Sequence, residues 1–388
     1  MPLFIIKQAK NNIKMIRIEP TTGKDKNTEN LSTMSRFIKY LVLIKFVPIQ
    51  HDQENSKPIF KLFSLTTLAY IMIFLGVPSI SALFDRIFFK EVHQLLLEMI
   101  RNANIIDKIS IIGFSLVNII TCPICPLLLA KAIPSIPLLT MDRDLKWPKN
   151  GLGFVISSIL IFFGYWVAQV SLMLDATEGK NIKKSSLMFS STLQMTQVFV
   201  LACFWVIPPL IFSSWIDKLI WLCNKKSSSN ILQHTKFCLN LFSDIKNGFG
   251  VFFLYVFGVS QFSSILSFFV VLSWPMSPDG FILTRFVYSV GLLSSSSGLI
   301  VNIVTITWKL DCGYQAMRGM TRPLQEILVT VQEDKYLRQE AKNMMCDIRN
   351  TGPFSGKGLF SITRGTLTGM LSIGVTYVII LVQFKMTV

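Results

Sequence analysis

The last apolar segment of the chain carries polar residues at a regular spacing. It reads GVTYVIILVQFKMTV over residues 374–388, with a Thr-Tyr pair and a Gln-Phe pair separated by five aliphatic residues. In a helix, at about 100° per residue, Thr376, Ile380 and Gln383 share one stripe, with Phe384 beside it. A polar stripe on an aliphatic membrane helix faces protein or water and not lipid. The stripe therefore either holds the helices of one subunit together or forms the wall of an aqueous path for ions.

A second set of polar and aromatic residues lies in the outer halves of the apolar segments. Trp166, Gln169, Gln197 and Gln261 lie about one turn or more inside the predicted ends, where an amide needs a hydrogen-bonding partner. A mostly apolar cleft with a few placed polar groups is the general form of a small-molecule site, so this set predicts a ligand pocket open to the outside. The alternative is an aromatic belt with hydrogen bonds between helices. The candidate ligand-binding residues are Asn118, Tyr165, Trp166, Gln169, Gln194, Gln197, Gln261 and Tyr288.

Other constellations give no catalytic or metal-binding signal. The stretch CPIC at 122–125 has the spacing of metal and redox sites, but it lies inside an apolar segment with no second Cys pair and no nearby His. We interpret it as a kinked helix with buried thiols. The sequence contains no phosphate loop, nucleophile elbow or Thr-Val-Gly-Tyr-Gly potassium filter. We therefore predict no enzyme activity, no cofactor and no metal site.

The composition is that of a polytopic membrane protein. Of the 388 residues, 51% are hydrophobic and only 15% are charged, and the mean hydropathy is +0.51. The formal charge of +16 is spread over the connections between apolar segments and forms no aromatic-interleaved patch, so nucleic acid is not an expected partner. The amino terminus has neither the continuous apolar region nor the cleavage site of a signal peptide, so we expect the first span to act as the insertion signal.

Seven apolar segments are long enough to cross the bilayer core, which takes about 20 residues. The predicted fold is therefore an all-α membrane protein with seven transmembrane helices. The sixth segment is the weakest, because SSSSG at 294–298 dilutes its apolar character and indicates a face packed on protein. The predicted spans are 60–84, 109–130, 152–174, 192–216, 249–272, 282–308 and 362–384.

The distribution of basic residues predicts the orientation. If the amino terminus is cytosolic, 27 of the 38 Lys and Arg residues lie in segments on the inside and eight lie in segments on the outside. We therefore predict a cytosolic amino terminus and an extracellular carboxyl terminus. All seven Cys then lie in spans or in cytosolic connections, so no extracellular disulfide framework is expected.

This orientation separates the chain from two other classes of membrane protein. A seven-span receptor that signals through a G protein runs the other way, and the stretch MDRDL at 141–145 follows the second span instead of the third. A small-solute transporter predicts repeats and discontinuous helices, and the sequence shows no internal repeat. The two classes are kept as alternatives, the receptor ahead of the transporter.

The connection before the last span is too long for a simple turn. From Arg322 to Arg349 its apolar residues recur at helical intervals, which predicts one amphipathic helix that ends before NTGPFSG. This helix either lies solvated on the membrane or, as its apolar stripe favours, packs on the ends of other spans or on copies in neighbouring subunits. The predicted organisation is a cytosolic segment 1–59, helices 1–6 with the ligand pocket in 60–308, a cytosolic anchor region 309–361, and a pore-lining helix with a short extracellular end in 362–388.

The last span resembles a known family. Thr376-Tyr377, five hydrophobic residues and Gln383-Phe384 resemble the Thr-Tyr-h-h-h-h-h-Gln-Phe signature of insect gustatory receptors, at its usual place before the carboxyl end. The preceding PFSGKGLFSITRGTLTGMLSIGV resembles the family's lead-in, with two Phe and small residues before the span. In sugar-sensing members a Glu tends to follow the Thr-Tyr pair, and here that position is Val378, so sugar specificity is not implied.

The resemblance implies a function and roles for the residues of the motif. It implies a ligand-gated, non-selective cation channel of four identical or related subunits, related to insect odorant receptors, in the plasma membrane of a chemosensory neuron and opened by a small-molecule tastant. Its partners are then the tastant, other subunits, membrane lipid and permeating cations. The last span lines a central pore and includes Thr376, with Gln383 and Phe384 at a narrow gate near the outer face and Ile380 one turn below. The cytosolic helices form a common anchor.

Glycosylation tests the predicted orientation. Asn30 begins NLS, the only glycosylation sequon of the chain, and it lies in the segment predicted to be cytosolic. We expect Asn30 to stay unmodified in cells, because glycans are added on the other side of the membrane. A shift in gel mobility after enzymatic removal of N-glycans would contradict this orientation and favour the G-protein alternative.

Overall fold

The computed structural model describes the second half of the chain most fully. The described residues are 50–51, 58–59, 67–68, 124, 127–132, 151–177, 205–224, 231–273, 282–330 and 334–387. Among them, only the backbone is described at 50–51, 58–59, 151, 169–177, 273, 282–285, 288 and 385–387. The first two predicted spans therefore lie almost entirely outside the described residues.

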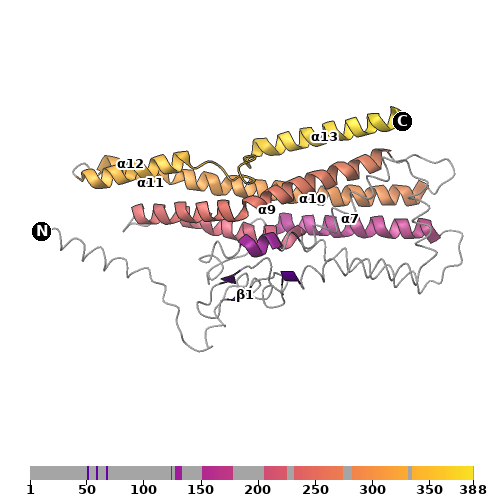
Figure 1. Cartoon of the computed structure of the whole chain (residues 1–388), viewed down its shortest axis with the longest axis horizontal. Coiled ribbons are helices and arrows are strands. Elements are labelled where there is room, and N and C mark those ends of the chain that lie inside the picture. Colours follow the sequence, from indigo (N-terminus) through magenta and orange to yellow (C-terminus); the bar gives the residue numbers. More distant parts are fainter. Residues whose placement is uncertain are drawn as a thin grey trace.

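Long helices dominate the described part of the chain, as an all-α membrane fold requires. The exception is an antiparallel pair of two-residue strands, β1 (Gln50–His51) and β2 (Pro58–Ile59). Figure 1 shows α7, α9 and α10 running side by side, with α11 and α12 near one end of this bundle and α13 along the other. The helices are α7 (Gly151–Thr177), Trp205–Asn224, α9 (Ile231–Ser273), α10 (Ile282–Gly319), α11 (Thr321–Thr330), α12 (Lys335–Asn350) and α13 (Arg364–Thr387).

The described helices agree with the predicted apolar segments from the third to the seventh, although residues 192–204 of the fourth segment lie outside the described residues. Four of them are long and apolar enough to cross a membrane, namely Trp205–Asn224, Ile231–Leu272, Ser289–Thr330 and Arg364–Phe384. The predicted span 152–174 falls within α7, whose apolar stretch Leu152–Ala168 is shorter. The all-helical membrane fold is thus confirmed, while the count of seven spans and their orientation stay predictions.

Two helices continue well beyond the hydrocarbon core. The helix α9 has 43 residues, which at about 1.5 Å per residue is about 65 Å, roughly twice the thickness of the core. It begins 18 residues before the predicted span 249–272, and α10 ends 11 residues after the predicted span 282–308. Much of the predicted connections is therefore helical and continuous with the spans.

The prediction of one helix from Arg322 to Arg349 was wrong, because the structure has two. The helix α11 ends at Thr330, and α12 begins at Lys335 after Asp334. The Asp334 carboxylate accepts hydrogen bonds from the backbone N–H groups of Tyr336 and Leu337 at 3.0 and 3.1 Å, which caps a new helix start. The apolar stripe itself was predicted correctly, since Leu324 of α11 and Ala341 of α12 are fully buried in the main core.

Small residues bring α7 and α10 into close contact. A Cβ atom at Gly291 would lie 2.6 Å from the backbone nitrogen of Ala168, and the Ser157 hydroxyl donates a 2.7 Å hydrogen bond to the Gly298 carbonyl. Such a close approach of two backbones is typical of packed membrane helices. Ser295 and Ser296 are buried, so the prediction that the SSSSG stretch packs on protein is confirmed.

Candidate pore helix and ligand pocket

The helix α13 packs on α9 through one narrow face. On this face Gly374 and Val378 are buried and Leu381 is half-buried. The Gln261 side chain of α9 donates a 2.9 Å hydrogen bond from Nε2 to the Met370 carbonyl of α13, and it fills the space where a Cβ atom at Gly374 would stand. A Cβ atom at 374 would therefore displace the Gln261 amide from this position. The amide of Gln261 makes an interhelical bond of the kind that the alternative interpretation predicts, and its role in ligand binding stays a prediction.

The Thr376 stripe lies on the opposite face of α13. At about 100° per residue, Thr376, Ile380 and Gln383 stand about 140 to 200° around the helix from Val378. All three are exposed, and the Phe384 side chain is 61% exposed. The Thr376 hydroxyl donates to the Ser372 carbonyl of its own helix at 3.0 Å. The stripe is therefore turned away from α9, which argues against the interpretation that it holds the helices of one subunit together.

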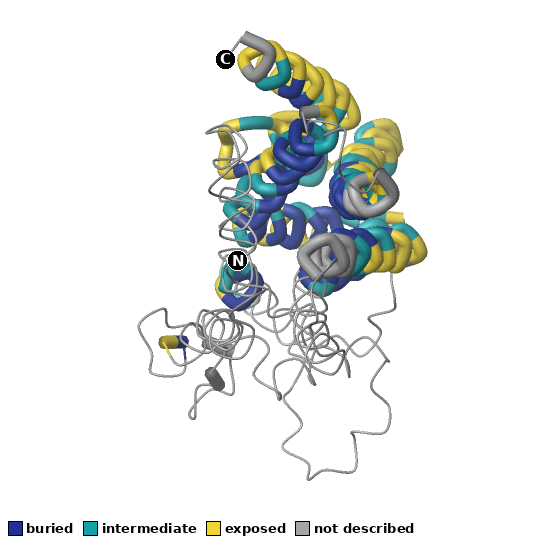
Figure 2. The backbone as a smooth tube through the Cα atoms, turned by 90° about the vertical axis from the view of Figure 1, so that its right-hand side faces the viewer, coloured by how far each residue is buried: buried dark blue, intermediate teal, exposed yellow. Residues whose placement is uncertain are grey.

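The rest of α13 also exposes much of its surface. In its most apolar window only 11% of the residues are buried inside the chain. Figure 2 shows α13, next to the carboxyl end, as a mostly exposed tube at the margin of the helices. The aliphatic flanks of α13 can face lipid, but its polar stripe cannot, so the two exposed surfaces need different surroundings. This arrangement fits lipid or protein on the flanks and protein or water on the stripe.

A short hairpin positions the start of α13. The Ile362 N–H donates to the Phe354 carbonyl at 2.7 Å, and the Gly356 N–H donates to the Phe360 carbonyl at 3.0 Å. The turn between the two Phe residues needs left-handed backbone at Lys357 and Gly358, whose φ angles are 54° and 83°. The first part of the family-like lead-in, residues 354–362, is thus a hairpin with a tight turn, and the rest belongs to α13.

The aromatic core holds this hairpin in place. The Phe354 side chain is fully buried, and its ring centroid lies 4.5 Å from that of Phe242 in α9. The Phe212 ring of helix Trp205–Asn224 stands edge-on to the Phe354 ring, with the centroids 6.5 Å apart. Ile362, at the other end of the hairpin, is also buried. The hairpin that leads into α13 is therefore packed against both of these helices.

Charged residues fix the same end of α13 to α10. The Arg364 Nε lies 2.8 Å from the Asp311 carboxylate, and the Arg364 guanidinium lies 3.9 Å from the centre of the Trp308 ring. Two residues before Asp311 on α10, the Lys309 ammonium pairs with Asp217 of helix Trp205–Asn224 at 2.5 Å. These residues were not predicted as functional from the sequence, although Trp308, Lys309 and Asp311 stand close together at the end of an apolar segment.

The candidate ligand-binding residues are only partly described. Tyr165 is buried and Trp166 is half-buried in α7, where the Trp166 ring centroid lies 6.0 Å from that of Phe163. Gln169 and Tyr288 lie in α7 and α10 with only their backbone described, and Asn118, Gln194 and Gln197 lie outside the described residues. The described residues therefore do not outline the predicted pocket.

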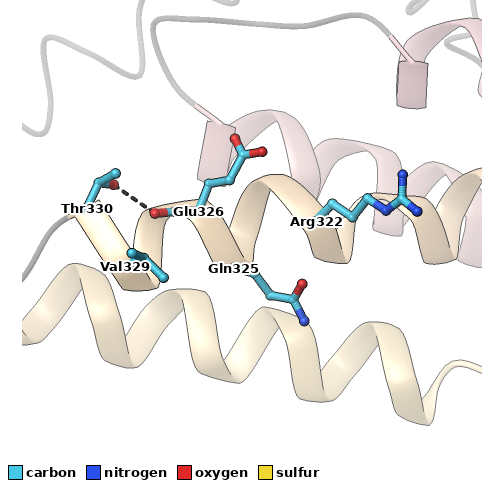
Figure 3. Close-up of a pocket in the computed structure, with 5 residues that line it drawn as sticks. All are labelled: Arg322, Gln325, Glu326, Val329 and Thr330. Carbon is cyan, nitrogen blue, oxygen red and sulfur yellow. Dashed lines mark hydrogen bonds between the residues drawn. The ribbon is translucent and has the colours of Figure 1, made fainter.

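Two shallow cavities lie at the other end of the molecule. One of about 380 Å³ is formed by one face of α11, where the Thr330 hydroxyl bonds the Glu326 carbonyl at 2.8 Å (Figure 3). The other, of about 440 Å³, lies between α9 and the end of α12, where Lys246 Nζ donates to the Gly352 carbonyl at 3.1 Å. Both belong to the predicted cytosolic region and not to the predicted ligand pocket.

Comparison with known proteins bears on the fold. No family model and no curated protein matches the sequence. Two solved structures of the insect olfactory receptor OR5 from Machilis hrabei match over 90% of this chain and 97% of their own chains. The structure in complex with eugenol has 11% sequence identity to this chain and a TM-score of 0.56. The other structure of the receptor has 12% identity and a TM-score of 0.57. The chain has the fold of an insect olfactory receptor.

This olfactory-receptor fold agrees with the resemblance drawn from the last span. The sequence motif pointed to insect chemoreceptors through about 30 residues, whereas the structural match extends over nearly the whole chain. At 11% to 12% identity the match shows the fold alone. The choice of the gustatory branch therefore rests on the sequence motif.

Proposed function

We propose that this chain is a subunit of a gustatory-receptor-like, ligand-gated and non-selective cation channel that a small-molecule tastant opens. The observation that carries the proposal is the exposure of the Thr376, Ile380 and Gln383 stripe on the face of α13 opposite its own core. The chain also has the fold of an insect olfactory receptor and the sequence signature of the gustatory receptors. We further propose that the channel acts in the plasma membrane of chemosensory neurons.

The proposed pore follows from the symmetry of an assembly of four subunits. A closed ring of identical or related chains brings the same face of each subunit to the central axis. If that face is the Thr376 stripe, its polar groups meet water and the aliphatic flanks of α13 meet lipid or neighbouring subunits. The polar groups are then nowhere exposed to hydrocarbon, where their burial is costly.

Two kinds of residue would control the ion path. Phe384 and Ile380 form narrow apolar rings, which exclude water and hence ions when they close. The Gln383 amides are neutral dipoles that replace part of the hydration of a cation without a fixed charge, so they discriminate weakly among cations. Gating then requires that the outer ends of the four α13 helices separate.

The ligand would act at the outer halves of the helices. One structural neighbour is described in complex with eugenol, a small aromatic molecule. In this chain we assign the ligand to the outer ends of α7, α9 and α10 and of the preceding spans, where Tyr165 and Trp166 offer aromatic surface and the candidate amides offer hydrogen bonds. The buried contact of Phe354 with helix Trp205–Asn224 and α9 offers a route from that region to α13.

Whole-cell recording with a panel of tastants, in cells that express this chain alone, tests the proposed function. We expect at least one tastant to evoke a current that reverses near zero in mixed sodium and potassium and that survives inhibition of G proteins. A response that disappears when G proteins are inhibited would support the receptor alternative. Absence of any current, alone and with related subunits, despite protein at the cell surface, would contradict the channel.

A further inference from the structure

One arginine connects the first turn of α13 to α10. The Arg364 Nε lies 2.8 Å from an Asp311 carboxylate oxygen, and the same guanidinium lies 3.9 Å from the centre of the Trp308 ring. Trp308 ends the predicted span 282–308, and Arg364 stands near the start of the predicted span 362–384. The contact therefore joins α10 and α13 at the predicted cytosolic boundary of the membrane.

The two charged partners of this contact differ in burial. The Asp311 side chain is 13% exposed, whereas that of Arg364 is 54% exposed. A largely desolvated carboxylate needs a cationic partner, and Lys309, the basic residue two positions before Asp311, is paired with Asp217. Water reaches the contact from the side of Arg364, so the chain should stay folded when this guanidinium is replaced.

The helix α10 extends from this contact to the predicted ligand region. It runs without interruption from Ile282 to Gly319, so Tyr288, a candidate ligand-binding residue, and Asp311 lie about 35 Å apart along one helix axis. Coupling between distant sites is carried by rigid elements of this kind. A displacement of α10 at its outer end would therefore also displace Asp311 and Trp308.

Two other roles fit this contact less well. An arginine that only extends to lipid headgroups needs no acidic partner on another helix. An ion pair that only adds surface stability needs no aromatic ring beside it. Here the guanidinium meets a ring and a carboxylate that stand three positions apart on one face of α10, which restrains its direction as well as its charge.

We propose that Arg364 is a positioning residue for the pore helix, which ties the cytosolic end of α13 to α10 so that a tastant that displaces α10 also moves α13. Gln383 and Phe384 lie about 30 Å further along α13, so a change of tilt at Arg364 moves them more than it moves the first turn. This inference rests on the proposed function, since it names the contact through which the ligand acts on the gate.

Hydrogen-deuterium exchange of the full-length protein in lipid nanodiscs tests the positioning without any current. We expect peptides that cover residues 363–372 to exchange faster in Arg364→Gln and Asp311→Asn than in the wild type, because the first turns of α13 then open more often. The matched control Arg322→Gln removes an exposed arginine of α11 and should leave this exchange unchanged. Exchange equal to that of the wild type in both variants would overturn the proposal.

Concentration-response curves test the consequence for gating. We expect Arg364→Gln and Asp311→Asn to raise the tastant concentration for half-maximal current about threefold to fivefold, which corresponds to the coupling of a partly exposed ion pair. Exchanging the two charges, in Arg364→Asp with Asp311→Arg, should restore part of the potency. A contact that only stabilises the fold would change the amount of surface protein and leave the potency as it is.

The two measurements separate this inference from the proposed function. A wild-type protein at the surface that carries no current contradicts the channel, while the exchange experiment still decides whether Arg364 holds α13. A channel that responds to tastant, and whose potency is unchanged or increased in both single variants, contradicts the coupling through Arg364 and leaves the channel itself intact.

Discussion

Replacing Phe384 with alanine should raise the current that flows without ligand. The Phe384 side chain is 61% exposed on a flank of α13, beside the Thr376 stripe. Four such rings near the outer end of a pore form an apolar constriction that closes by excluding water, and alanine leaves that constriction too wide to dry. Whole-cell recording without tastant measures the leak, normalised to surface protein by biotinylation.

Leu381→Ala is the matched control for this experiment. Leu381 lies on the same helix one turn from Phe384, but it belongs to the half-buried face toward α9. We expect a much smaller change in leak from this variant, because it does not border the proposed path. If Phe384→Ala reaches the surface and leaks no more than Leu381→Ala, the ring is not a gate.

Replacing Asp217 with leucine should remove most of the protein from the cell surface. The Lys309 side chain is only 5% exposed, and its ammonium lies 2.5 Å from the Asp217 carboxylate. Breaking a buried ion pair by removing one partner costs about 3 to 5 kcal/mol, a large part of the roughly 5 to 15 kcal/mol that stabilises a folded protein. Surface biotinylation and thermal unfolding in detergent measure the loss.

Two further variants separate this ion pair from a general loss of charge. The double variant Asp217→Leu with Lys309→Met should recover part of the surface protein, because an apolar pair can replace a buried ion pair at little cost. Arg364→Gln should lose much less than Asp217→Leu, since Arg364 is 54% exposed and exposed ion pairs contribute at most about 1 kcal/mol. Equal losses in Asp217→Leu and Arg364→Gln would contradict the importance assigned to burial.

Hydropathy predicted the described spans well and their ends poorly. The described parts of the apolar segments from 152 onward fall almost entirely in helices, because a run of about 20 apolar residues has few other stable conformations in a membrane. The start of α9, ILQHTKFCLNLFSDIKN, is amphipathic, so an average over a window hides its helical character. The start of α12 is set by Asp334, which caps the helix. This cap was not predicted, because the apolar residues on both sides of Asp334 fit the spacing of one continuous helix.

The candidate site was also predicted only in part. That Thr376, Ile380 and Gln383 share one stripe could be predicted from the sequence, because it depends only on the period of the helix. Which face of α13 packs on its own chain depends on long-range contacts, such as the bond of Gln261 to the Met370 carbonyl, that local sequence does not specify. The ion pair of Arg364 with Asp311 and its cation–π contact with Trp308 likewise join residues more than 50 positions apart.

Cysteine accessibility along α13 tests the central claim, that the Thr376 stripe faces a water-filled ion path. A charged methanethiosulfonate reagent, applied outside during exposure to tastant, reacts with a cysteine only where water reaches it. The account predicts that the reagent alters the evoked current of Thr376→Cys and Gln383→Cys and leaves that of Val378→Cys and the wild type unchanged. Evoked currents that stay unchanged in Gln383→Cys and Thr376→Cys, with both proteins at the surface, would contradict the pore assignment.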